Sequence, residues 1–206
     1  MNVSLSPVSK ALSLFRRIVL NSLSASKRSP ATALRGDTDA KVLLVGPPIT
    51  QFDEAQASAF AGGAARAFDQ LLQDAGGPRT EQFLCVACNA FGLKPSAEST
   101  VPIRQFVSAL DQSGQLKLII LVGKEAFKAI INSGKLPPQS MTEGRRLSIP
   151  PFRTEILTLP SPEALWFAQP EDEFTHRRLA RAQQSAARLY ARILQPHVPL
   201  LNSLCV

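Results

Sequence analysis

The chain has 206 residues, of which 45% are hydrophobic and 19% charged, and this is enough apolar material for one packed domain with an added arm. No apolar run reaches the length of a membrane span, and three cysteines do not make the framework of a small secreted disulfide protein. Residues 1–36 hold six of the 23 basic residues and none of the 16 acidic ones, so this segment carries +6 of the net +7. The rest of the chain is close to neutral, so its charge does not imply a strong attraction of the whole domain to phosphate, and local basic patches stay open.

Residues 1–39 are predicted to form a basic amphipathic arm, and residues 40–206 are predicted to form the domain. An acid-free, amphipathic start that contains Arg and Ser is typical of a mitochondrial transit peptide, which would place the protein in mitochondria. A disordered basic tail, or an arm that binds DNA, RNA or a protein partner, remains open, with a cytoplasmic location as the alternative. The basic residues that would make a nucleic-acid or partner contact are Arg16, Arg17, Lys27 and Arg28.

A strand followed by a helix is predicted between Lys41 and Gly77. The run Lys41–Gly46 is rich in Val and Leu and has no charge after its first residue, which is typical of a buried parallel strand. A proline-containing turn follows, and then a segment with helical periodicity that ends at Gly76, the predicted C-cap. The apolar positions expected to share one helical face are Phe60, Ala64, Phe68, Leu71, Leu72 and Ala75. A ligand of such a unit would lie over the carboxyl end of the strand.

Three further strands are predicted at 81–89, 116–123 and 154–159, separated by helices at 102–112 and from 124 onward. Strands that alternate with helical segments predict an α/β fold, here a three-layer α/β/α sandwich with a mainly parallel four-stranded sheet. Cys85 and Cys88 form a C-x-x-C pattern on the second strand, where residues three apart point to opposite faces. We therefore interpret both as core residues, and we predict no metal site.

A final helix is predicted from about Glu173 to Leu194. Its expected apolar face consists of Leu179, Ala182, Ala186, Leu189 and Ile193. Arginines lie mostly off that face. They either form a solvated surface or contact nucleic acid or a protein partner, and the candidates for such a contact are Arg177, Arg178 and Arg181.

The stretch around the first strand and helix resembles the first motif of the uracil-DNA glycosylase superfamily, particularly the family 4 type. That motif runs from a strand through G-E-A-P-G, an acidic pair and F-V-G-R-A-G to a helix that ends in A-G. Laid on this chain without gaps, it places Gly46 on the first glycine, Asp53 and Glu54 on the acidic pair and Phe60 on the phenylalanine. The resemblance continues more weakly to about Phe167 and implies a glycosylase-like fold.

Uracil excision needs a stacked, flipped base, an amide that reads its edge, a polar group that places water and a donor that stabilises the leaving anion. The resemblance puts Phe60 at the stacking position but Pro47 at the position of the water-activating acid. The base-reading asparagine falls on the apolar second strand, with Asn89 two or three residues away. Leu159 takes the place of the histidine that precedes Pro-Ser, here Pro160 and Ser161.

Family 4 members also hold an iron–sulfur cluster through four cysteines. The segment before Lys41 contains no cysteine, so we predict no cofactor. The sequence therefore predicts a base pocket at the place that the superfamily uses, but without the side chains that excision requires. Its candidate residues are Gly46, Pro47, Asp53, Phe60, Asn89, Leu159 and Ser161.

The leading hypothesis is a catalytically degenerate, non-enzymatic protein that serves as an interaction subunit, with other protein subunits, of a larger assembly. A mitochondrial ribonucleoprotein such as the ribosome, or a DNA-maintenance complex, would fit. One alternative is a divergent, active uracil-DNA glycosylase of base-excision repair that uses Phe60 with Asp53 or Asn89 in new roles. Another is a replication subunit, because the clamp-loader psi subunit also resembles a stripped glycosylase domain with a proline-led Leu segment and a closing helix.

Overall fold

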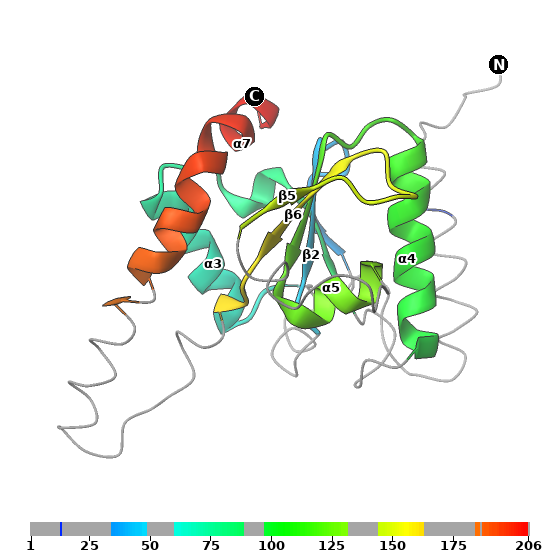
Figure 1. Cartoon of the computed structure of the whole chain (residues 1–206), viewed down its shortest axis with the longest axis horizontal. Coiled ribbons are helices and arrows are strands. Elements are labelled where there is room, and N and C mark those ends of the chain that lie inside the picture. Colours follow the sequence, from blue (N-terminus) through cyan, green and yellow to red (C-terminus); the bar gives the residue numbers. More distant parts are fainter. Residues whose placement is uncertain are drawn as a thin grey trace, which may run out of the picture.

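The computed structural model describes residue 13 and residues 34–48, 60–88, 97–131, 144–162, 184–185 and 187–205. These residues form a central sheet with helices on both sides (Figure 1). The candidate residues Asp53 and Asn89 lie outside them. So do Arg16, Arg17, Lys27 and Arg28 of the arm and the arginines at 177, 178 and 181.

The sheet has six strands in the order β1-β3-β2-β4-β6-β5. The four central strands are parallel to one another, and β1 and β5 pair with them antiparallel at the two edges. The strands are β1 Leu34–Gly36, β2 Val42–Gly46, β3 Leu84–Ala87, β4 Leu118–Val122, β5 Arg146–Leu147 and β6 Glu155–Leu159.

The four strands predicted from the sequence are confirmed as β2, β3, β4 and β6. The prediction of a four-stranded sheet is wrong, because two edge strands extend it. Both are only two or three residues long and partly exposed, so neither has the continuous apolar run that marks a buried parallel strand. β1 precedes residue 40, the predicted start of the domain, and pairs with β3.

Strand residues alternate between two apolar layers, one on each face of the sheet. Leu43 and Val45 of β2 pack in the layer that contains α4 and α5, while Val42 and Leu44 pack in the layer that contains α3 and the C-terminal helices. Figure 1 shows α3 and α7 on one side of the sheet and α4 and α5 on the other. The predicted α/β/α layering therefore agrees with the described residues. The helices are α3 Gly63–Asp74, α4 Ala97–Gln112, α5 Gly123–Ile131 and α7 Val198–Leu204, with short 3-10 helices η2 at Thr80–Gln82 and η5 at Gln195–His197.

Helix α3 begins later than its apolar spacing suggested. Phe60 has a φ of 55° and lies in the turn before the helix, whose N-cap is Gly62, so its expected place on the helical face is wrong. Phe68, Leu71 and Leu72 are buried as predicted. The C-cap is Ala75, one residue before the predicted Gly76. Gly76 follows it with a left-handed φ of 83°, and its N–H donates to the carbonyl of Gln73, so the helix ends where glycine was expected to end it.

Residues 184–185 and 187–194 are helical and form the end of the predicted final helix. The expected apolar face is wrong at Leu189, which is 60% exposed, whereas Tyr190 and Leu194 are buried against the sheet layer. Within the described part of the chain, no helix is long and apolar enough to cross a membrane.

Candidate functional site

The carboxyl ends of the four parallel strands meet at one end of the sheet, where ligands of such sheets bind. Gly46 of β2 lies beside Ala87 of β3, and Val122 of β4 lies beside Leu159 of β6. The N–H of Cys88 donates to the carbonyl of Gly46 at 3.2 Å, which ties the loop after β3 to the end of β2. The fold thus brings the candidate residues Gly46, Leu159 and Ser161 to the same end.

Phe60 covers the end of β2. A Cβ atom at Gly46 would lie 2.5 Å from Cδ2 of the Phe60 ring, so the ring needs a glycine beneath it. The ring also makes an edge contact with Phe68, with centroids 5.9 Å apart, and Phe60 is only 5% exposed. In this structure the aromatic ring belongs to the core, although it lies at the position that the superfamily motif assigns to base stacking.

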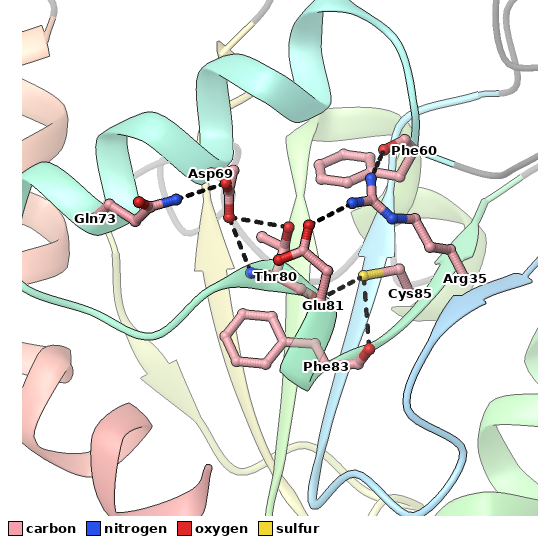
Figure 2. A network of polar contacts seen from close by, with 8 residues as sticks. All are labelled: Arg35, Phe60, Asp69, Gln73, Thr80, Glu81, Phe83 and Cys85. Carbon is pink, nitrogen blue, oxygen red and sulfur yellow. Dashed lines mark hydrogen bonds and ion pairs between the residues drawn. The ribbon is translucent and has the colours of Figure 1, made fainter. Parts of the chain in front are cut away.

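The left-handed backbone of Phe60 is held by Arg35 of β1. Arg35 Nη1 donates to the Phe60 carbonyl at 2.9 Å, and Nη2 pairs with Oε1 of Glu81 at the same distance (Figure 2). The guanidinium thereby joins an edge strand, the turn before α3 and the residues that lead into β3. The hydrogen bond to Phe60 restrains its left-handed backbone conformation, which costs about 1–3 kcal/mol by itself.

A second part of the same network joins α3 to the start of β3 (Figure 2). Asp69 Oδ1 accepts from the N–H of Thr80 at 2.9 Å and from its hydroxyl at 3.1 Å, while Oδ2 accepts from Gln73 at 2.6 Å. The Cys85 thiol donates to the Thr80 carbonyl at 3.6 Å, and burial raises the pKa of this thiol to about 12. Such a thiol stays protonated at neutral pH, which disfavours a role as a nucleophile.

The remaining candidate residues supply little chemistry. Leu159 is fully buried in the core layer with Phe60, so no polar side chain points from this position. Pro47 directly follows β2 and has no group that accepts a proton. The Ser161 Cβ lies 3.1 Å from the point where Gly123 would carry its own Cβ, and Gly123 has a φ of 88° where β4 turns into α5. Gly123 thus opens α5 where the sequence predicted the end of a strand.

Tyr190 packs against the end of the sheet, and sequence reasoning did not identify it as a residue of this region. Its hydroxyl donates to the carbonyl of Pro160 at 2.7 Å, and its ring makes an edge contact with Phe68 at 6.3 Å. Burial raises the pKa of Tyr190, so the hydroxyl remains a donor. The hydrogen bond holds the C-terminal helix against the segment that follows β6. Tyr190 is the only tyrosine in the chain, and this was the one feature of the sequence that could have drawn attention to it. Helical spacing could not show which residue its hydroxyl contacts.

Cys85 and Cys88 lie in opposite core layers, as their spacing on a strand predicted. Among the described residues, no group of three or more His, Cys, Asp or Glu side chains is arranged to hold a metal ion. A pocket of about 770 Å³ lies elsewhere, between the end of α3 and the start of β3. It is lined by Gln73, Gly76, Gly77, Pro78, Arg79, Glu81 and Gln82.

The family model of the uracil DNA glycosylase superfamily matches residues 34–183. The chain belongs to this superfamily. The match begins at β1, so the edge strand that carries Arg35 is part of the superfamily domain, and it ends before the described C-terminal helix. A search of curated proteins returned no match to the chain.

Proposed function

We propose that this superfamily member has lost glycosylase chemistry and serves as an interaction subunit of a larger assembly. The observation that carries the proposal is Leu159, a fully buried apolar side chain at the position that the superfamily motif gives to the anion-stabilising histidine. Pro47 supports it, because it stands where the motif has the water-activating acid. A fold can persist after its catalytic residues are lost, because the apolar core still stabilises it. Here Phe60 and Leu159 are part of that core at the end of the sheet.

The direct test is excision of uracil. A single-stranded oligonucleotide with one uracil is incubated with the full chain and then treated with alkali, which cleaves the strand at an abasic site. We expect no cleavage above that of the buffer control. A matched sample with a known active uracil-DNA glycosylase shows that the substrate is competent. Cleavage that increases with the amount of this protein contradicts the loss of activity.

A divergent glycosylase is the second candidate, and one observation favours it. Phe60 is held in a left-handed conformation by Arg35, and strained residues of this kind cluster at functional sites. Asp53 and Asn89 would then take the polar roles. If the oligonucleotide is cleaved, the double variant Asp53→Ala and Asn89→Ala should abolish cleavage, and full activity in that variant removes both residues from the mechanism.

The proposed assembly is mitochondrial, with the basic arm as the targeting segment or as a contact to nucleic acid. Because β1 begins at Leu34, a processed chain that keeps the sheet must start before that residue. Residues 1–33 fused to a fluorescent protein should direct it to mitochondria, and Arg16→Glu with Arg17→Glu should stop this. If the arm instead binds nucleic acid, its deletion should reduce the dependence of binding on salt.

A further inference from the structure

The outward surface of the C-terminal helix forms a ridge of exposed side chains. We call this the outer ridge, and it consists of Ser185, Arg188, Leu189, Arg192 and Gln195. Positions three and four residues apart lie on one side of a helix, so the ridge faces away from the buried Tyr190 and Leu194. These two residues hold the helix on the α3 side of the sheet, where Figure 1 shows it in orange and red. The ridge is therefore a surface on a docked helix.

The charge of this region is one-sided. Residues 174–206 contain five arginines, no lysine and no acidic residue, whereas residues 37–173 contain 12 basic and 16 acidic residues. Within the described ranges, neither Arg188 nor Arg192 forms an ion pair with a carboxylate. A guanidinium binds a carboxylate or a phosphate through two parallel hydrogen bonds, so the ridge offers two sites for an anionic partner.

Leu189 indicates which anionic partner fits. It is 60% exposed and is the one large apolar side chain of the described residues with such exposure. It lies between Arg188 and Arg192 on the ridge. An apolar partner surface would gain free energy by covering it, whereas a phosphodiester backbone has no such surface. The ridge also has no aromatic side chain on which a base could stack. Arginine is also enriched at protein–protein interfaces and among their hot-spot residues.

We propose that the outer ridge is a docking surface for an acidic, amphipathic segment of a partner protein. Carboxylates of that segment pair with Arg188 and Arg192, and an apolar side chain covers Leu189. The superfamily match ends at residue 183, so this surface lies on a segment beyond the matched domain. The inference rests on the proposed role as an interaction subunit and specifies the surface that serves it.

The first experiment compares native complexes of full-length tagged chains by gel filtration of lysates from the protein's own host cells. The double variant Arg188→Glu and Arg192→Glu should move the chain from a large complex to the monomer position, with binding about tenfold weaker or more. Leu189→Ala should weaken the complex in the same direction. The matched control is Lys124→Glu with Lys128→Glu, which makes the same charge change on exposed positions of α5, on the other side of the sheet.

The outcomes separate the two proposals. A complex that persists in the Arg188→Glu and Arg192→Glu variant overturns the docking surface and leaves the assembly role intact. A wild-type chain that elutes as a monomer overturns both. Equal losses in the ridge variant and the Lys124→Glu and Lys128→Glu control show a non-specific charge effect and also overturn the docking surface. Unchanged thermal unfolding of all variants confirms that they fold.

The second experiment identifies the class of partner. A photo-reactive benzophenone side chain in place of Ser185 is activated in the native complex, and the cross-linked product is analysed by mass spectrometry. A cross-linked peptide with net negative charge and apolar residues, lost in the Arg188→Glu and Arg192→Glu background, supports the proposal. A cross-linked oligonucleotide, or a complex that nuclease dissolves, shows that phosphate is the ligand and overturns it.

Discussion

The amino and carboxyl ends of the parallel strands differ in the side chains that surround them. At their amino ends, side-chain hydrogen bonds brace the loops. Asp69 holds Thr80 before β3, and Asp111 holds the N–H groups of Arg153 and Thr154 before β6 at 2.9 and 2.8 Å. Gln115 donates to the carbonyls of Thr38 and Ala40 before β2, both at 3.1 Å. At the carboxyl ends, the described side chains are mainly apolar.

Among the described residues, which do not include 49–59, 89–96 and 163–183, this arrangement differs from what a parallel α/β sheet normally provides. Ligands of such sheets bind at the carboxyl ends, where polar side chains are expected. Asp69, Asp111 and Gln115 bond backbone groups at the amino ends. At the carboxyl ends, Arg35 and Tyr190 bond the carbonyls of Phe60 and Pro160, while Phe60 and Leu159 supply apolar packing. These polar side chains bond backbone groups of the domain itself, so the described polar contacts stabilise the fold. The contribution of each end to stability can be measured separately.

The largest effect is expected at the carboxyl end. Phe60→Ala removes a ring that packs on Gly46 and Phe68, and such core truncations cost about 3–5 kcal/mol of unfolding free energy. Urea unfolding followed by circular dichroism measures the change. Leu189→Ala, at an exposed position, is the control and should change stability by about 0.5 kcal/mol or less. A loss of less than about 1 kcal/mol for Phe60→Ala means that the ring is not a core residue and weakens the comparison.

The amino end is tested by Asp111→Ala. The substitution leaves two backbone N–H groups before β6 without their acceptor, and we expect a loss of about 3 kcal/mol in unfolding free energy. Asp74→Ala removes an exposed carboxylate that accepts a hydrogen bond from Gln70, and it should cost little unfolding free energy. Equal effects of the two variants in urea unfolding would show that the amino end is not braced by Asp111.

A smaller effect is expected where the C-terminal helix meets the segment after β6. Tyr190→Phe keeps the ring but removes the hydrogen bond to Pro160, and the loss should be about 1 kcal/mol. Ser203→Ala removes an exposed hydroxyl that donates to Leu200 and serves as the control. Thermal unfolding distinguishes them, and a Tyr190→Phe protein as stable as the wild type would show that the hydroxyl contributes nothing to docking.

The smallest effect at neutral pH concerns Cys85. Burial raises the pKa of its thiol from 9.0 to about 12, so the folded state keeps a proton that the unfolded state releases. Its contribution to stability is complete below pH 9 and is lost as the pH rises from 9 toward 12. Unfolding free energies measured from pH 8 to 11 should therefore fall less steeply in Cys85→Ala than in the wild type. The half-buried Cys205 provides the control, since Cys205→Ala should change the slope less. Identical slopes for wild type and Cys85→Ala would show that burial does not raise the pKa of the Cys85 thiol.

The sequence by itself determined the central sheet. A parallel strand that is buried on both faces must be apolar along its whole length, and Val42–Val45 and Leu118–Val122 follow this rule. The opposite orientations of Cys85 and Cys88 also followed from the period of a strand. The residue types at positions 47 and 159 were visible as well, and neither a proline nor a leucine side chain can transfer a proton.

Only the tertiary structure decided the features that depend on distant partners. Arg35 looked like one more charge of a basic arm, yet it contacts Phe60 and Glu81, which lie 25 and 46 residues away. The buried face of the final helix was misplaced at Leu189 because apolar spacing does not show where a neighbouring helix lies. Tyr190 is buried because Phe68 and the Pro160 carbonyl meet it there, and this contact turns Leu189 and the arginines beside it outward.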